Sequence, residues 1–248
     1  MPVLSSLVRL AGRACLVGAA CVVMAACASR PVDTGPPRDR IAVFDPVADG
    51  VGGWEHYVLR RASTRYSVVD TPHGPLLRAE GRRSASILIQ VLNRPVNRSC
   101  GRLTWQWWVE KPQPGADLTD RRRHDVGASI FVAFGDPGVF RDRRVPTLQY
   151  VWTNRDAAAD AVLTGPYHEE HLRTMIIRRG PGTGGPVTET RDVFADFRRA
   201  FGSPAEPGVH AVALFTDNDD TGEPITAYYG PVEFRCMKGD VTAPAGEE

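Results

Sequence analysis

The sequence predicts a mainly β fold, a single sandwich of short strands with one capping helix. Short apolar or alternating segments recur along the chain, and turn-forming residues separate them: the 248 residues include 24 Gly and 20 Pro. Many short strands between Gly and Pro turns are typical of a β-sandwich. The expected strands cover residues 41–44, 54–59, 66–69, 75–79, 86–92, 102–110, 128–134, 147–152, 172–178, 209–215 and 225–234.

The strand at 102–110 has the clearest alternation. Side chains two residues apart lie on the same face of a strand, so one face carries Leu103, Trp105, Trp107 and Val109. The other face carries Thr104, Gln106, Trp108 and Glu110. An indole on a polar face suits sugar binding, because flat aromatic rings stack on pyranose rings. The alternative is that a loop or the helix covers Trp108.

One helix is expected over residues 191–201. Val193, Phe197 and Phe201 recur at helical spacing with Phe194 beside them, which predicts an apolar face packed on the sandwich. Gly202 and then Pro204 end the helix. The aromatic spacing indicates a core contact in preference to a ligand site.

The N-terminus is typical of a bacterial lipoprotein signal peptide over residues 1–26, with Cys27 as the acylated residue. Its apolar run is shorter than the roughly 20 residues of a membrane-spanning helix. We expect residues 27–40 to hold the acylated Cys27 and a Pro-rich flexible tether, 41–238 the β-sandwich, and 239–248 a disordered tail. The protein would then be anchored in the cell envelope, facing the periplasm, with the outer membrane as the expected location.

Charge argues against a nucleic-acid partner. Signal-peptide cleavage removes two of the 30 basic residues, so the mature chain carries 28 basic against 29 acidic residues. Proteins that track phosphate backbones need a basic excess or stripe. The expected partners are the membrane, through the lipid anchor, and a polysaccharide or cell-wall glycan.

Two cysteines remain after cleavage and acylation, Cys100 and Cys236. In an oxidising envelope compartment, two remaining thiols most simply form a disulfide. Free buried thiols are the alternative.

An acidic segment, TDNDDTG (216–222), follows the expected strand at 209–215. Asp217, Asp219 and Asp220 offer the oxygen ligands that Ca²⁺ prefers. The segment is no EF-hand, because Tyr228 occupies the position of the bidentate Glu. The alternative is a turn whose Asp and Asn side chains bond their own backbone.

No catalytic residue can be assigned from the sequence. The carboxylates of Glu110, Asp125, Asp217 and Asp219 would support glycoside hydrolysis if they converged in a cleft. The dipeptide His124-Asp125 precedes the strand at 128–134 and would pair with the acidic segment or remain a loop feature. The sequence HEEH (168–171) lacks the His-Glu-x-x-His order of zinc proteases. Neither a Gly-x-Ser-x-Gly elbow nor a phosphate-binding glycine loop is present.

Taken together, these motifs resemble a bacterial family of envelope proteins known as the domain of unknown function numbered 3047. The matching segments are LTWQW (103–107), His124-Asp125 with the strand at 128–134, LQYVW (148–152), RDVFADF (191–197), TDNDDT (216–221) and AYYG (227–230). Members usually carry an acidic residue where His124 stands and Thr where Asn218 stands. The resemblance implies a jelly-roll sandwich of the galactose-binding kind and supplies no activity.

Three functions follow as hypotheses. The first is a non-catalytic glycan-binding sandwich that uses Trp108, His124 and Asp125, with a structural Ca²⁺ in the acidic segment. The second is a glycan-active hydrolase or lyase with carboxylates near Asp125 and Asp217. The third is an outer-membrane scaffold or interaction protein. Convergent carboxylates in a cleft would favour the enzyme, and an exposed aromatic platform would favour the binding module.

Overall fold

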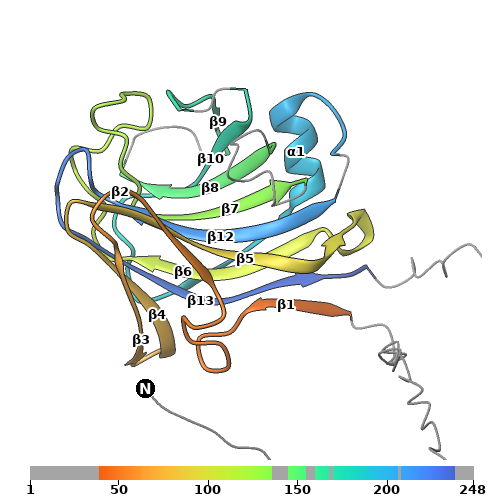
Figure 1. The fold of residues 1–248 in the computed structure, drawn as a ribbon, viewed down its shortest axis with the longest axis horizontal. Helices are drawn as coiled ribbons and strands as arrows, with labels where there is room; N and C mark the ends of the chain where they lie inside the picture. Colours follow the sequence, from red (N-terminus) through yellow and green to blue (C-terminus); the bar gives the residue numbers. More distant parts are fainter. Residues whose placement is uncertain (1–38, 136–144, 155–159, 168–169, 206–207, 238–248) are drawn as a thin grey trace, which may run out of the picture. The chain divides into compact units, whose positions relative to one another are not determined.

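Two β-sheets packed against each other form the body of the protein (Figure 1). The computed structural model describes residues 39–135, 145–154, 160–167, 170–205 and 208–237. The six-stranded sheet has the order β11-β6-β13-β4-β3, with β1 paired to β13, and the seven-stranded sheet has the order β2-β5-β12-β7-β8-β10-β9. The fold class is the one that the sequence predicts, a mainly β sandwich of the jelly-roll kind with one helix.

The strands of the six-stranded sheet are β1 (Arg40–Phe44), β3 (Arg65–Thr71), β4 (Gly74–Gly81), β6 (Arg102–Val109), β11 (Val187–Asp192) and β13 (Ile225–Arg235). The strands of the seven-stranded sheet are β2 (Glu55–Arg61), β5 (Ser84–Val96), β7 (Ala128–Phe134), β8 (Thr147–Thr153), β9 (Val162–Leu163), β10 (Leu172–Arg179) and β12 (Val209–Asp217). Every expected strand is present, and β9 and β11 were not expected. Neighbouring strands are antiparallel except β8 and β10, which are parallel.

The core lies between the sheets, and β6 supplies its largest side chains. The residues expected to face inward, Leu103, Trp105, Trp107 and Val109, are all fully buried. Trp105 stacks on Tyr150 of the other sheet, with ring centroids 5.2 Å apart. The alternation read from the sequence therefore identifies the inner face of β6 correctly.

The helix α1 (Val193–Phe201) begins two residues later than expected, because Asp192 is its N-cap. The Asp192 side chain accepts hydrogen bonds from the backbone N–H groups of Phe194 and Ala195, and residues 187–192 belong to β11. Phe194 and Phe197 pack on the ring of Phe134 at the end of β7. The aromatic residues of the helix are thus core contacts, as their spacing indicates.

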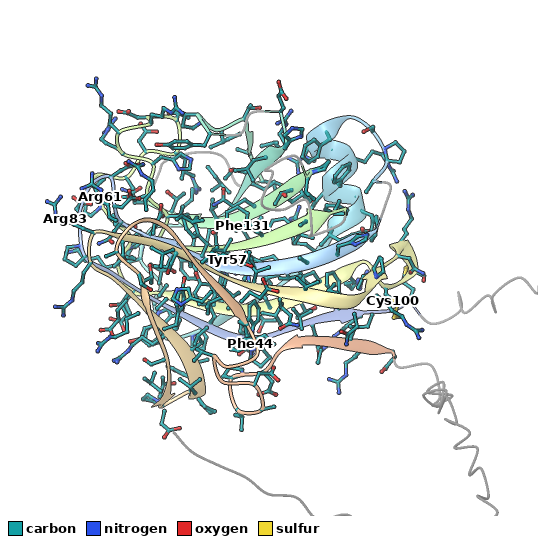
Figure 2. The ribbon with its side chains drawn as sticks, in the orientation of Figure 1. Phe44, Tyr57, Arg61, Arg83, Cys100 and Phe131 are labelled. Carbon is teal, nitrogen blue, oxygen red and sulfur yellow. A yellow bond between two sulfur atoms is a disulfide. The ribbon has the colours of Figure 1, made fainter. Side chains whose placement is uncertain are left out.

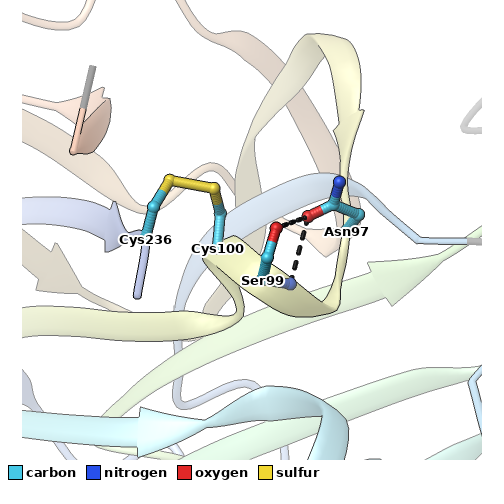
Figure 3. Close-up of a disulfide and its surroundings, with 4 residues drawn as sticks. All are labelled: Asn97, Ser99, Cys100 and Cys236. Atoms are coloured by element: carbon cyan, nitrogen blue, oxygen red, sulfur yellow. Dashed lines mark hydrogen bonds between the residues drawn. A yellow bond between two sulfur atoms is a disulfide. The ribbon is translucent and has the colours of Figure 1, made fainter. Parts of the chain in front are cut away.

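The structure contains the predicted disulfide, Cys100–Cys236 (Figure 3). Cys100 ends a short 3-10 helix, η1 (Arg98–Cys100), whose N-cap Asn97 accepts a hydrogen bond from the backbone of Ser99. Cys236 follows β13, the strand paired with β1, β4 and β6. The bond joins residues 136 positions apart and ties the end of β13 to the start of β6.

Several expectations fall outside the described residues: the signal peptide, the acylation of Cys27, the tether up to residue 38, and the C-terminal tail. The first half of the HEEH segment, residues 168–169, also falls outside them. Among the residues that the structure describes, no helix is both long and apolar enough to cross a membrane.

Candidate functional site

Three carboxylates meet at one end of the sandwich. Asp125 precedes β7, Asp217 ends β12, and Asp219 lies in the turn that follows. One oxygen of each lies within 4.8 Å of one oxygen of the other two, and all three residues are buried. The sequence analysis grouped Asp217, Asp219 and Asp220 as a candidate metal site. In the structure, the third member of the group is Asp125 and not Asp220. We call Asp125, Asp217 and Asp219 the aspartate cluster.

Asp125 holds the acidic turn in place. Its Oδ1 accepts a hydrogen bond from the backbone N–H of Asp220 at 3.0 Å, and its Oδ2 accepts one from the backbone N–H of Thr221 at 2.8 Å. The Thr221 hydroxyl also donates to Oδ2. The turn is therefore held by a side chain from a distant loop as well as by its own side chains: Asn218 donates to the carbonyl of Glu223 at 2.8 Å, and the Thr221 hydroxyl accepts from the N–H of Glu223 at 3.2 Å.

Asp217 and Asn218 connect the turn to its neighbours. Asp217 Oδ1 accepts a hydrogen bond from the backbone N–H of Val126 at 2.6 Å. The Asn218 side chain accepts from the N–H of Ser84 and donates to the carbonyl of Gly81. These bonds place the acidic turn beside the start of β5, which explains the burial of Asp217 and Asn218.

Burial and mutual repulsion disfavour negative charge in the aspartate cluster. Burial, followed by the charge of Asp125, raises the pKa of Asp217 well above its usual range. Burial also raises the pKa of Asp219, against the opposing effect of Arg60. Arg60 Nε and Arg61 Nε lie 3.3 and 3.6 Å from Asp219 Oδ2, at ion-pair distance but without hydrogen-bond geometry.

Arginines surround this end of the sandwich. Arg61 and Arg83 lie there together (Figure 2). Arg60 also donates a hydrogen bond to Asp220 Oδ1 at 3.3 Å. Asp219 and Asp220 therefore both lie beside arginines, whereas the hydrogen bonds of Asp125 and Asp217 come from backbone N–H groups and the Thr221 hydroxyl.

His124 is directed to a different neighbour from Asp125. Its ring packs edge-on against Tyr167, with centroids 5.2 Å apart, and Arg121 lies over the same tyrosine ring. Burial lowers the pKa of His124, which favours the neutral imidazole. His124 and Asp125, adjacent in sequence, therefore contact separate groups.

Trp108 belongs to an aromatic group on the outer face of the six-stranded sheet. Its indole stacks on Tyr228 of β13, with centroids 5.1 Å apart and an interplanar angle of 27°, and meets the His73 ring edge-on at 5.8 Å. Its Nε1–H donates to the carbonyl of Gly182 at 3.4 Å. Trp108 and Tyr228 are both half-buried. The loop at Gly182 covers part of the indole, as the alternative interpretation of Trp108 expects, and the side chain lies on the outer face that the alternation predicts.

The residues expected to contact a ligand thus belong to two places. Trp108 contacts Tyr228 and His73, whereas Asp125 contacts the acidic turn and His124 contacts Tyr167. The cluster carboxylates are buried and engaged with backbone N–H groups or arginines. Such groups suit fixing a loop or holding a cation, and Glu110 does not join them.

Sequence reasoning missed Tyr228 as the partner of Trp108. Alternation places Tyr228 on the outer face of β13, since Ala227 and Tyr229 on either side of it are fully buried. The stack depends on the register that pairs Tyr228 with Trp108 across two strands more than 100 residues apart. No local pattern contains that register.

The model of one protein family, described as "Protein of unknown function (DUF3047)", matches residues 52–233. The chain belongs to this family. The match includes all of the aspartate cluster and the Trp108–Tyr228 pair. It confirms the resemblance drawn from the motifs. No curated protein matches the chain.

Solved structures similar to this chain include a carbohydrate-binding module and an enzyme domain. The family 11 carbohydrate-binding module of a Clostridium thermocellum cellulase is 8% identical, with a TM-score of 0.43 and coverage of 80% of this chain and 95% of that one. The xyloglucanase domain of NopAA from Sinorhizobium fredii is 12% identical, with a TM-score of 0.41 and coverage of 74% and 93%. At these values, neither similarity assigns a function to the chain.

Proposed function

We propose that this protein is a lipid-anchored component of the bacterial envelope whose β-sandwich binds a polysaccharide or cell-wall glycan as a non-catalytic module. The observation that carries the proposal is the stacked, half-buried pair of Trp108 and Tyr228 on the outer face of the six-stranded sheet. The parts of the indole and the phenol that stay exposed present flat apolar area that a sugar ring would cover.

Polar side chains adjoin this aromatic pair on the same face. Gln106 of β6 donates a hydrogen bond to the Thr188 hydroxyl of β11 at 3.3 Å, and Thr104 and Thr190 pair through their hydroxyls at 3.1 Å. Amide and hydroxyl groups beside an aromatic surface match the mixed apolar and hydroxyl character of a saccharide. The combination supports sugar binding better than it supports an apolar ligand.

The proposal is tested by binding to purified peptidoglycan and to exopolysaccharide, in pull-down assays and by calorimetry. Trp108→Ala and Tyr228→Ala should each weaken binding about tenfold, which corresponds to about 1.4 kcal/mol. The matched control is Tyr57→Ala, because Tyr57 is a half-buried aromatic residue on the seven-stranded sheet (Figure 2). Equal binding by the wild type and both platform variants would contradict the proposal, as would loss of binding in Tyr57→Ala alone.

We also propose that the aspartate cluster holds a structural divalent cation, with Ca²⁺ as the first candidate. Three carboxylates within 4.8 Å of one another supply hard oxygen donors, and the raised pKa values of Asp217 and Asp219 indicate that negative charge is poorly compensated there. Calcium takes six to eight oxygen ligands, so backbone carbonyls or waters would complete its coordination.

A cation that binds only the folded protein raises the melting temperature in proportion to the logarithm of its concentration above Kd. We expect such a rise in millimolar calcium, reversed by a chelator. A melting curve that stays unchanged across calcium and chelator would leave the turn as a purely hydrogen-bonded structure.

A further inference from the structure

Four side chains form a row across the outer face of the six-stranded sheet. Strand register pairs Ser67 of β3 with Arg78 of β4, Arg78 with Tyr228 of β13, and Tyr228 with Trp108 of β6. Neighbouring strands lie about 4.8 Å apart, so the row is roughly 14 Å long. It continues the Trp108–Tyr228 platform toward β3. We call these four residues the outer row.

The outer row points away from the core. On β4, Leu77 and Ala79 on either side of Arg78 are fully buried, and Trp107 and Val109 flank Trp108 in the same way. Alternation therefore directs the four side chains of the row to the outside.

The β3 and β4 end of the row is positively charged. Arg65 and Arg78 share one carboxylate, Glu80: Arg65 Nη2 contacts Glu80 Oε2, and Arg78 Nη2 lies 3.4 Å from the same oxygen. A hollow of about 290 Å³ opens beside them, lined by Ser63, Arg65, Glu80 and Arg82. The lining holds two arginines and one glutamate, a formal excess of one positive charge, and Arg78 beside Glu80 adds a second.

Two polar atoms in the row lack a partner. Ser67 Oγ and Arg78 Nε are buried and form no hydrogen bond in the part of the chain that the structure describes. These residues are cross-strand neighbours. A buried polar atom without a partner is unfavourable, so an acceptor that reaches these two atoms would be favoured.

We infer that the glycan bound by this face is anionic, with a carboxylate on the sugar ring, as in a polymer of uronic acids. The inference rests on the proposed function, because the Trp108–Tyr228 platform takes the ring face. The Arg78 guanidinium and the arginines of the hollow take the carboxylate, for which the planar guanidinium fork is well matched. Ser67 adds a hydroxyl donor beside Arg78.

The opposite end of the face carries the opposite charge. Glu110 follows Trp108 on the same side of its strand, and its charge contributes to the raised pKa of Tyr228 after burial. An anionic substituent would therefore be attracted to the β3 and β4 end and repelled at the Glu110 end. The ligand carboxylate is predicted to lie over Arg78.

The test compares two polymers with the same sugar backbone, polygalacturonate with ionised carboxylates and its highly methyl-esterified form with neutral esters, by calorimetry without added divalent cations. The wild type should bind polygalacturonate at least tenfold more tightly, and the preference should decrease between 50 and 500 mM NaCl through screening. Arg78→Gln and Arg65→Gln should each weaken binding of polygalacturonate more than binding of the ester. Arg65 is well exposed, so its replacement keeps the test valid if Arg78→Gln fails to fold. Arg94→Gln, an exposed arginine of β5, is the charge-matched control.

The outcomes separate this inference from the proposed function. Equal affinity for the two polymers, both dependent on Trp108, would overturn the anionic assignment and leave glycan binding intact. Failure to bind any glycan would overturn both. Suppose instead that the protein binds dextran sulfate more tightly than dextran, through these arginines, and shows no preference for polygalacturonate. That result would overturn the assignment of a carboxylate as the anionic group and favour a sulfate.

Discussion

Replacement of Asp217 by Asn should stabilise the calcium-free protein at neutral pH and abolish its response to calcium. Asp217 is buried beside Asp125 and Asp219, and burial together with these charges raises its pKa in the folded state. A carboxyl group whose folded-state pKa is raised binds its proton more tightly in the folded than in the unfolded protein. Its favourable contribution is therefore complete at low pH and is lost as the pH rises through the folded-state pKa.

The magnitude follows from proton linkage. Each such carboxyl group lowers the free energy of unfolding by at most about 1.4 kcal/mol for each pH unit between its unfolded and folded pKa values. In Asp217→Asn, the new amide would keep an acceptor for the Val126 N–H and carry no charge. The decrease in the free energy of unfolding with rising pH that Asp217 causes should therefore disappear. Asp219, whose pKa is also raised, should leave a smaller decrease in the free energy of unfolding with rising pH.

The assay is urea denaturation followed by tryptophan fluorescence, from pH 4 to pH 8, in chelator and then in millimolar calcium. Asp70→Asn, an exposed carboxyl group in β3, is the matched control and should follow the wild type. The reasoning would be refuted if Asp217→Asn destabilised the chelated protein by the same amount at every pH. It would also be refuted if the variant kept the full calcium response.

Three further predictions concern the anchor, the disulfide and the core. Cys27→Ala should release the protein from membranes, because acyl chains contribute about 0.8 kcal/mol per buried methylene group; membrane pelleting of the variant after a salt wash would contradict the lipoprotein prediction. Mass spectrometry without reductant should find Cys100 and Cys236 linked, and reduction should lower stability by about 5 kcal/mol in the chain-entropy model; two free thiols would contradict the pairing. Trp105→Ala should lower the free energy of unfolding by about 3–5 kcal/mol, because Trp105 is fully buried on Tyr150, and a loss under 1 kcal/mol would show that this core is wrongly described.

The strands could be predicted where one face is apolar, and they were missed where that contrast is weak. β11 contains Val187 and five polar residues, because it is an edge strand, so its sequence has no apolar period. The side chains of Glu189 and Arg191, which face inward, form ion pairs: Glu189 with Arg178, and Arg191 with Asp196. Ion pairs between distant segments replace the hydrophobic signal on which a sequence prediction depends.

The candidate sites were predictable as residue types and not as arrangements. Asp125 accepts hydrogen bonds from Asp220 and Thr221, which are 95 and 96 residues away, so the aspartate cluster exists only once β7 and β12 are paired. The alternation of side chains along β6 correctly placed Trp108 on the outer face of the strand. Its stack on Tyr228 and the outer row through Arg78 depend on strand register, which sequence alone does not provide.

The most direct test of glycan binding is a titration with oligosaccharide that follows the indole N–H signals of the five tryptophans by NMR. The chain contains five Trp residues, of which Trp105 and Trp107 are fully buried and Trp108 is half-buried, so the buried indoles and the Trp108 indole report on different environments. Binding at the Trp108–Tyr228 platform should shift the Trp108 signal strongly and leave those of Trp105 and Trp107 nearly unchanged. A saturating oligosaccharide that leaves the Trp108 signal in place while shifting amides around Tyr57 and Phe131 would contradict the account.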